Sequence, residues 1–337
     1  MSGKQWQPEE LSRLAHGYWA SCALQAGVQT GLTAALCDGP AAPPALAERL
    51  GLNTRGAAML CTALYALGLL QRRRDGAYAL APGLQALLDP ASPRSLVNMV
   101  LHMADMVGDW SRLAECVASG KGVEELGPPP EDKEGRAHFY RAMRDIARGQ
   151  APGLAARLGL ASGQSLLDLG GGPGVYALTF ADEVPGLKAA VFDLPGSRRF
   201  FQEEAARHRG AERVRFLAGD YEDGELGGPY DVVWISQVLH GEGPAACQAL
   251  IDKAAGALKP GGVLWVQEFV LDPVQPEHPW PALFALNMLI NTPAGQSYTA
   301  AEISGFMERA GLVEAHYAGP TKPGGPSGLV RGSKPRK

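Results

Sequence analysis

Residues 165–174 read Ser-Leu-Leu-Asp-Leu-Gly-Gly-Gly-Pro-Gly, and this stretch decides the fold of the second half of the chain. Its apolar run, Ser165–Leu169, is typical of a strand that is buried on both faces. Three glycines follow at alternate positions: Gly170, Gly172 and Gly174. A glycine-rich turn between the first strand of a parallel sheet and a helix lets a ligand approach the backbone closely. The stretch therefore predicts a cofactor-binding turn.

The spacing of the glycines helps to choose the cofactor. The fingerprint of dinucleotide-binding proteins, G-x-G-x-x-G, would need a glycine at position 175, where this chain has Val175. The form found here, G-x-G-x-G, shortens the turn by one residue and suits a ligand that lies across the loop. A nicotinamide-dependent oxidoreductase is therefore only a weak alternative.

Short β-rich apolar runs alternate with helical segments in the rest of this half. The predicted strands cover residues 165–169, 188–192, 214–217, 231–236 and 263–269, followed by an edge hairpin at 313–317 and 328–332. Such alternation indicates an α/β fold with a doubly wound, mostly parallel, seven-stranded sheet.

The first half is predicted to be mainly α-helical. Residues 46–80 suggest a helix, a turn at Gly51, a second helix and a short hairpin, which is the order of a winged helix. A transcriptional regulator is one interpretation. However, the second helix has only Arg55 near its start and is otherwise apolar, which favours a packing and dimerisation platform. We expect this domain to cover residues 1–126, a linker and bridging helix 127–150, and the catalytic domain 151–333.

Composition narrows the class of protein. The 337 residues can form two cored domains, and 31 Lys and Arg against 35 Asp and Glu give a net charge of −4. This balance does not favour nucleic acid or an anionic membrane as a partner. Five widely spaced cysteines and the absence of a long apolar stretch favour a reduced, cytoplasmic setting. The seven histidines are scattered, so no metal site is expected.

Acidic residues lie at or directly after the ends of the first three predicted strands. Asp168 is the next-to-last residue of the first, and Asp193, 19 residues after Gly174, directly follows the second, where a carboxylate can accept two ribose hydroxyls. Asp220 follows the third strand, where it can accept an exocyclic amine. Each acid alone could be a cap or a loop residue, but three at successive strand ends predict one binding site.

Five stretches carry a family resemblance: LLDLGGGPG (166–174), VFDLP (191–195), AGDY (218–221), DVVWISQVLH (231–240) and LKPGGVLWVQEF (258–269). Together they resemble the class I S-adenosylmethionine-dependent methyltransferases. More narrowly, the whole chain resembles the small-molecule O-methyltransferases that include plant caffeate and acetylserotonin enzymes and many bacterial natural-product enzymes. The resemblance implies a Rossmann-like catalytic domain, a small-molecule acceptor, and a homodimer formed through an N-terminal winged-helix domain.

The resemblance also implies roles for residues in binding S-adenosyl-L-methionine. The three glycines would form the cofactor loop, Asp193 would hold the ribose, and Leu194 would also belong to the cofactor site. Asp220 and Tyr221 would recognise the adenine. Ser236 occupies a position where other members often carry a lysine near the methionine portion, and Asp168 would help to hold the ammonium group.

His240 is the candidate general base, because histidine titrates near neutral pH and a hydroxyl acceptor must lose its proton. The resemblance implies that Glu268 orients it. Alternatively, His240 could bond a loop carbonyl and Glu268 could face solvent. Two departures reduce the expected carboxylate support: His240 is followed by Gly241 and Glu242 instead of Asp and Trp, and no second glutamate appears in residues 294–299.

The segment 271–296 and the bridging helix are implied to form the acceptor pocket, with the candidate residues Phe139, Met143, Phe284, Met288 and Asn291. Few charges lie there, which favours a flat apolar or aromatic acceptor. The accepting atom stays open among oxygen, sulfur, nitrogen and carbon, because one scaffold serves all four. A cofactor-sensing regulator and a dimeric scaffold without turnover remain alternatives of another class.

Overall fold

The computed structural model describes residues 5–123, 133–272, 279–323 and 325–336. The chain forms two compact units, residues 1–106 with 137–145, and residues 107–136 with 146–337. Much of the predicted linker, residues 127–132, lies outside the described residues.

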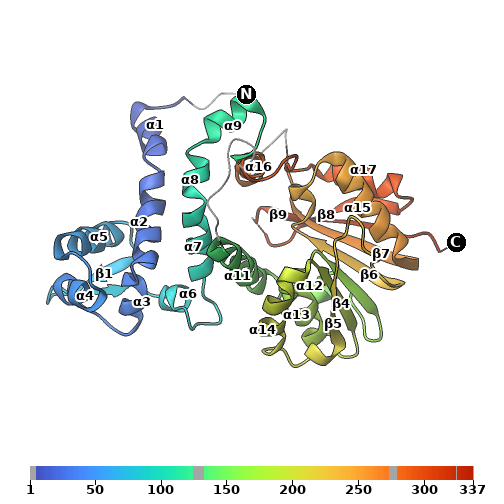
Figure 1. The fold of residues 1–337 in the computed structure, drawn as a ribbon, viewed down its shortest axis with the longest axis horizontal. Coiled ribbons are helices and arrows are strands. Elements are labelled where there is room, and N and C mark those ends of the chain that lie inside the picture. Colours follow the sequence, from blue (N-terminus) through green and yellow to red (C-terminus); the bar gives the residue numbers. More distant parts are fainter. Residues whose placement is uncertain (1–4, 124–132, 273–278, 324, 337) are drawn as a thin grey trace. The chain divides into compact units, whose positions relative to one another are not determined.

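The first unit is mainly helical. Its elements are α1 (Pro8–Ala15), α2 (Tyr18–Gln29), α3 (Leu32–Cys37), α4 (Pro43–Leu50), α5 (Thr54–Ala66), β1 (Leu70–Arg72), β2 (Tyr78–Leu80), α6 (Gln85–Leu88) and α7 (Val97–Asp105). The helix-turn-helix and the hairpin predicted for residues 46–80 are present as α4, α5, β1 and β2 (Figure 1). Gly51, with φ of 67°, ends α4, and the Asn53 side chain accepts a hydrogen bond from Gly56 N–H to start α5.

The second unit begins with helices that precede its sheet in the chain. These are α8 (Val107–Trp110), α9 (Leu113–Ser119), α11 (Lys133–Gln150), which the two units share, and α12 (Leu154–Arg157). Trp110 Nε1 donates a hydrogen bond to Asn287 Oδ1 at 3.0 Å, which joins α8 to α16 (Trp280–Asn291). Because α8 and α9 pack against α16, they group with the second unit, whereas the sequence predicts a boundary at residue 126.

The seven-stranded sheet predicted from the sequence is confirmed. Its strands are β3 (Ser165–Leu169), β4 (Lys188–Asp193), β5 (Val214–Ala218), β6 (Tyr230–Ser236), β7 (Leu258–Phe269), β8 (Val313–Pro320) and β9 (Ser327–Ser333). Their order is β5-β4-β3-β6-β7-β9-β8; the first five are parallel, and β9 pairs antiparallel with both β7 and β8. The order of the strands reverses at β3, because β4 and β5 lie on one side of it and β6 and β7 on the other. Such a point of reversal usually binds ligands in folds of this kind.

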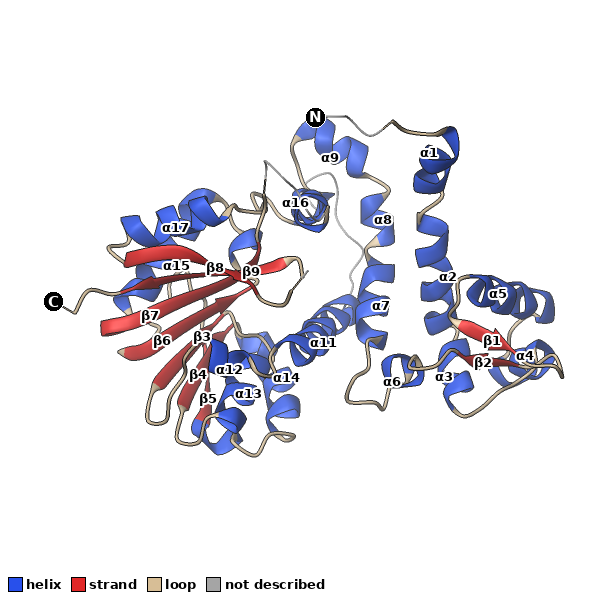
Figure 2. Ribbon diagram, turned by 180° about the vertical axis from the view of Figure 1, so that it is seen from behind, coloured by secondary structure: helices blue, strands red, loops and turns tan. Residues whose placement is uncertain are grey.

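Helices cover both faces of this sheet (Figure 2). On one face lie α12, α13 (Val175–Glu183) and α14 (Arg198–Ala205), packed over side chains such as Leu166 and Trp234. On the other face lie α15 (Pro244–Gly256) and α17 (Ala300–Arg309), packed over Val233 and Ile235. The alternation of faces along β6 explains why the strand is a continuous apolar run. Short 3₁₀ turns complete the unit at Pro195–Ser197, Ala211–Arg213 and Leu239–Gly241.

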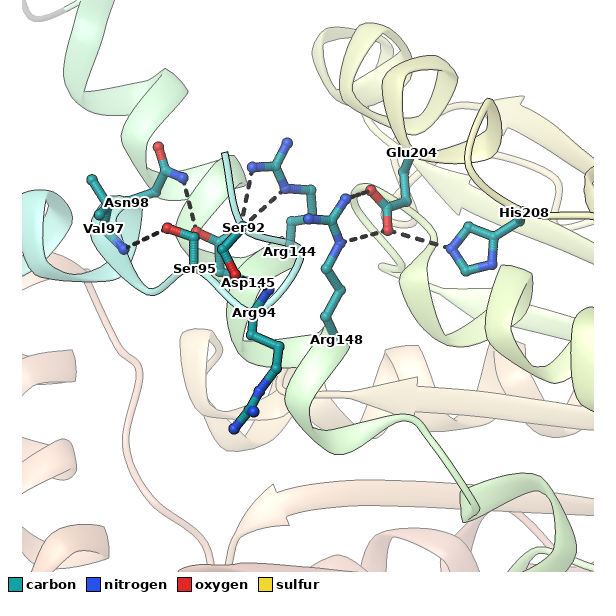
Figure 3. A network of polar contacts seen from close by, with 10 residues as sticks. All are labelled: Ser92, Arg94, Ser95, Val97, Asn98, Arg144, Asp145, Arg148, Glu204 and His208. Atoms are coloured by element: carbon teal, nitrogen blue, oxygen red, sulfur yellow. Dashed lines mark hydrogen bonds and ion pairs between the residues drawn. The ribbon is translucent and has the colours of Figure 1, made fainter. Parts of the chain in front are cut away.

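A buried ion network fixes the end of α11 in the second unit. The Arg148 guanidinium pairs with the Glu204 carboxylate of α14, and His208 lies within reach of the same carboxylate (Figure 3). Burial alone would raise the pKa of Glu204, but the hydrogen bonds from His208 and Arg148 outweigh it and lower the pKa to about 2. The network therefore holds a charged pair in place, two residues before Gln150.

All five cysteines are free thiols. Among the residues that the structure describes, no helix is both long enough and apolar enough to cross a membrane.

Candidate active site

The glycine turn after β3 has the shape that its sequence predicts. Gly170, Gly172 and Gly174 have φ values of 72°, 53° and 74°, in the left-handed region that favours glycine. A Cβ on Gly174 would lie 2.7 Å from the Phe201 ring, so a larger residue would also collide there. A Cβ on Gly172 would have no atom within 4 Å, so the turn is open at Gly172 and packed at Gly174.

Asp193, the last residue of β4, closes the turn from the neighbouring strand. Its Oδ2 accepts a hydrogen bond from Gly172 N–H at 2.8 Å. Burial raises the pKa of Asp193, and the Gly172 hydrogen bond acts in the opposite direction. The next residue, Leu194, is 48% exposed although it is apolar. The two residues present a carboxylate and an apolar side chain beside the glycine turn.

Asp168, the next-to-last residue of β3, lies deeper and is only 1% exposed. Its Oδ2 accepts a hydrogen bond from Ala177 N–H at 3.3 Å, whereas Oδ1 has no hydrogen-bond partner. Burial raises the pKa of this carboxyl group to about 7, with a smaller contribution from the charge of Asp193. A buried acceptor without a partner is costly and indicates a place for a cationic ligand group.

Polar groups on the same face of the sheet surround this position. Ser236 Oγ and Gln267 Oε1 are buried and have no hydrogen-bond partner. Gln150 Oε1 accepts hydrogen bonds from Gln267 Nε2 at 2.7 Å and from Tyr176 O–H at 3.0 Å. Burial raises the pKa of Tyr176 to about 12, so this hydroxyl stays protonated. These groups fit the charged amino-acid end of S-adenosylmethionine.

The loop after β5 places the predicted adenine residues. Asp220 is exposed, and its Oδ1 accepts a hydrogen bond from Glu222 N–H at 2.9 Å. Tyr221 is half-buried, and its hydroxyl donates to Glu242 Oε1 at 2.5 Å. Nothing in the sequence pattern indicates this contact between Tyr221 and Glu242, because the two residues are 21 positions apart on different loops.

His240 and Glu268 form the pair that the sequence predicts. His240 lies in the 3₁₀ turn after β6, and Glu268 lies near the end of β7. His240 Nδ1 is 2.9 Å from Glu268 Oε2, and Glu268 also accepts hydrogen bonds from His240 N–H at 3.3 Å and Phe269 N–H at 3.2 Å. Glu268 is 2% exposed, so it does not face solvent. A carboxylate on Nδ1 favours the tautomer whose Nε2 is free to accept a proton.

Aromatic rings surround the imidazole. The Phe284 ring lies 4.8 Å from the His240 ring, centroid to centroid, in an edge-on arrangement, and the Phe269 ring stacks at 6.4 Å. The ring centroids of Phe269 and Trp280 are 6.1 Å apart, and Trp280 is 47% exposed. The sequence gives no sign of a site role for Phe269, although this residue directly follows Glu268, whereas Trp280 lies in the segment 271–296 that is expected to form the acceptor pocket. The rings form an apolar wall beside a polar pair.

The predicted acceptor residues are not all found together. Of those on α16, Phe284 reaches His240, Met288 is buried, and Asn291 is exposed and bonds back to Asn287 O at 2.9 Å. Phe139 and Met143 belong to the first compact unit, so their role stays a prediction. Within the described parts of the chain, no cluster of three His, Cys, Asp or Glu side chains could hold a metal ion.

Comparison with known proteins connects this site to an enzyme family. Residues 110–313 match the profile of the O-methyltransferase domain, and residues 12–89 match that of the O-methyltransferase dimerisation domain. The chain is 32% identical, over 98% of its length and 97% of the relative, to the tetracenomycin polyketide synthesis 8-O-methyl transferase TcmO of Streptomyces glaucescens. It is 30% identical, over 97% and 95%, to the 3-hydroxy-5-methyl-1-naphthoate 3-O-methyltransferase of Streptomyces sahachiroi.

A solved structure gives the same answer for the fold. Human N-acetylserotonin methyltransferase, in complex with S-adenosylmethionine, superposes with a TM-score of 0.88 at 25% identity and covers 99% of both chains. The sequence left the accepting atom open, and the two Streptomyces relatives, which are O-methyltransferases, favour oxygen.

The buried carboxyl group of Asp168 gives a first test. Because its pKa is raised from 3.8 to about 7, the cost of ionising it in the folded protein appears as the pH rises above 3.8 and is complete above 7. We therefore expect Asp168→Asn to raise the free energy of unfolding of the ligand-free protein above pH 7 by roughly 2–4 kcal/mol, and by much less near pH 4. Urea denaturation at several pH values measures this difference.

The same variant should bind S-adenosylhomocysteine at least about tenfold more weakly in calorimetry, since a neutral amide attracts an ammonium group less strongly. Asp223→Asn, at an exposed position, is the control for the change of charge. Equal stability of wild type and Asp168→Asn across the pH range would contradict the buried, unpartnered state of this carboxyl group.

Proposed function

This chain belongs to the family of S-adenosylmethionine-dependent small-molecule O-methyltransferases, and we propose that its acceptor is the phenolic hydroxyl group of a flat aromatic molecule. The observation that carries the proposal is the hydrogen-bonded pair of His240 and Glu268 beside the rings of Phe269 and Phe284. The names of two relatives, which act in tetracenomycin synthesis and on a hydroxynaphthoate, support an aromatic acceptor.

S-adenosylmethionine supplies a methyl group on a positively charged sulfur, so methyl transfer needs no covalent intermediate with the protein. The chain must position the acceptor oxygen in line and remove its proton. In our proposal the aromatic wall of Phe269, Phe284 and Trp280 packs against the flat acceptor and excludes water. His240 Nε2 then receives the phenolic proton.

Glu268 supports this proton transfer in two ways. It accepts the Nδ1 hydrogen of His240 at 2.9 Å, which holds the ring with Nε2 directed away from the carboxylate. When Nε2 gains a proton, the buried negative charge of Glu268 stabilises the imidazolium. The hydrogen bonds from the backbone of His240 and Phe269 fix the carboxylate in that position.

We further propose how the chain holds the cofactor. Gly170, Gly172 and Gly174 would provide the open backbone of the loop, and Asp193 with Leu194 would hold the ribose. Asp220 and Tyr221 would recognise the adenine. The unpartnered oxygens of Asp168 and Ser236 support binding of the charged amino-acid end.

The acceptor class is tested by a methyl-transfer screen. We expect the purified enzyme, given S-adenosylmethionine, to methylate hydroxylated naphthalenes or larger fused aromatic phenols, detected by mass spectrometry as a product with one added methyl group. Matched thiols and amines on the same ring systems serve as controls. Turnover of the thiols or amines in preference to the phenols would contradict the proposal.

The role of His240 is tested by its removal. We expect His240→Ala to lower kcat by about 10²–10⁴ at neutral pH, because the phenol keeps its proton, while the affinity for S-adenosylhomocysteine stays nearly unchanged. The loss should shrink at alkaline pH, where the phenol ionises by itself, and Glu268→Gln should lose less. His316→Ala, on the exposed part of β8, is the control. Wild-type rates for His240→Ala at neutral pH would refute base catalysis.

We also propose that the chain forms a homodimer through its first unit. The dimerisation-domain profile covers residues 12–89, and α1 has no buried residue although it carries Leu11 and Leu14. Tyr18 and Trp19 are also more than half exposed. Four large apolar side chains left in water on neighbouring helices indicate an interface.

Light scattering tests the dimer. We expect a mass twice the 35.5 kDa of one chain at micromolar concentration, and a shift toward the monomer for the double variant Leu14→Glu with Trp19→Glu. The matched control is Val313→Glu, at an exposed apolar position in the second unit. A monomeric wild-type protein would contradict the proposal.

A further inference from the structure

Glu242 directly follows the turn that carries His240, Leu239–Gly241, and its side chain contacts Tyr221 in the loop after β5. Its Oε1 accepts the hydrogen bond from Tyr221 O–H at 2.5 Å. A short bond from a hydroxyl to a carboxylate is among the stronger hydrogen bonds in proteins. Burial and the charge of Glu242 both raise the pKa of Tyr221, so the phenol remains a donor.

The turn itself needs such support because its backbone is irregular. Gln237, just before it, has φ of 58°, a conformation that is uncommon for a residue with a side chain. The turn extends for only three residues, Leu239–Gly241, and Glu242 N–H closes it by donating to Leu239 O at 3.0 Å. A short turn of this kind depends on contacts with its surroundings to keep one conformation.

Two tyrosine hydroxyl groups donate hydrogen bonds to Glu242. Its backbone oxygen accepts a hydrogen bond from Tyr298 O–H at 2.6 Å, and its side chain accepts the one from Tyr221. Tyr221 is in turn held by its own backbone oxygen, which accepts a hydrogen bond from Lys253 Nζ at 2.6 Å. Glu268 secures the other part of the turn through the backbone and ring of His240. Glu242 therefore connects the loop after β5, through Tyr221, to the turn that carries His240.

We propose that Glu242 is a positioning residue that couples, through Tyr221, the adenine side of the cofactor site to the orientation of His240. The inference rests on the proposed function, which assigns adenine recognition to Tyr221 and proton transfer to His240. It gives a role to a departure in the sequence, since the glutamate stands where related enzymes often carry a tryptophan. A ligand that fixes Tyr221 would then also fix the turn, and an ordered turn would favour the ligand.

A set of variants tests the coupling. We expect Glu242→Ala to weaken binding of S-adenosylhomocysteine about 3- to 20-fold in calorimetry and to lower kcat by a similar factor on a phenolic acceptor. Tyr221→Phe should give the same changes, and the double variant should be no worse than either single one, because both remove one bond. Glu242→Gln keeps an acceptor oxygen and should recover most of both losses. Glu225→Ala, exposed on the loop after β5, is the control.

The pH profile separates positioning from a structural role. If Glu242 acts through His240, the loss of kcat in Glu242→Ala should shrink at alkaline pH, where the phenol needs no base. Unchanged affinity and unchanged kcat in folded Glu242→Ala would overturn the inference, and so would additive effects in the double variant. A loss of kcat that is the same at every pH would also overturn it.

Variants of Tyr221 distinguish a failure of the proposed function from a failure of the positioning role. If Tyr221→Ala left the affinity for S-adenosylhomocysteine unchanged, the assignment of adenine recognition would be wrong, and the coupling would fall with it. If Tyr221→Ala weakened binding while the Glu242 variants did not, only the positioning role would be wrong.

Discussion

Parallel strands that end at one edge of a sheet impose the constraint on which this site depends. β3, β4, β6 and β7 run in the same direction, so their last residues meet although they are far apart in the sequence. Asp193 and Ser236 are the last residues of β4 and β6, and Asp168 and Glu268 are each one residue before the end of their strands, β3 and β7. The hydrogen bonds of the sheet thus set the positions of the polar groups, and the apolar strands behind them supply the rigidity.

The proposed chemistry at this edge requires buried carboxylates, whose burial is energetically unfavourable. Asp168 and Glu268 are almost completely buried, which is unfavourable for a carboxylate without compensation. Glu268 is compensated within the chain, by His240 and by two backbone N–H groups. Asp168 is compensated only in part, by Ala177 N–H. The difference matches the two proposed tasks, since one carboxylate orients a base and the other awaits a cationic ligand group.

Much of this arrangement could be predicted from the sequence because local signals are strong where strands meet loops. The alternation of apolar runs predicts all seven strands, six of them to within three residues at each end, while β7 begins at Leu258, five residues before its predicted start. The glycine spacing located the turn after β3. The link between His240 and Glu268 came from resemblance, since 28 residues separate them. The contact of Tyr221 with Glu242 and the packing of α8 against α16 had no sequence signal. Both bring together segments that are far apart in the sequence.

The central claim is that Glu268 holds His240 in the tautomer that leaves Nε2 free to take a proton. Nitrogen NMR of the enzyme with ¹⁵N-labelled histidine reports this directly, with His240 assigned by comparison with His240→Ala. In spectra recorded at alkaline pH, the account predicts a protonated Nδ1 and an unprotonated Nε2, and a change of that pattern in Glu268→Gln. A wild-type spectrum with the proton on Nε2 would contradict the account, because that nitrogen could not accept the proton of the acceptor.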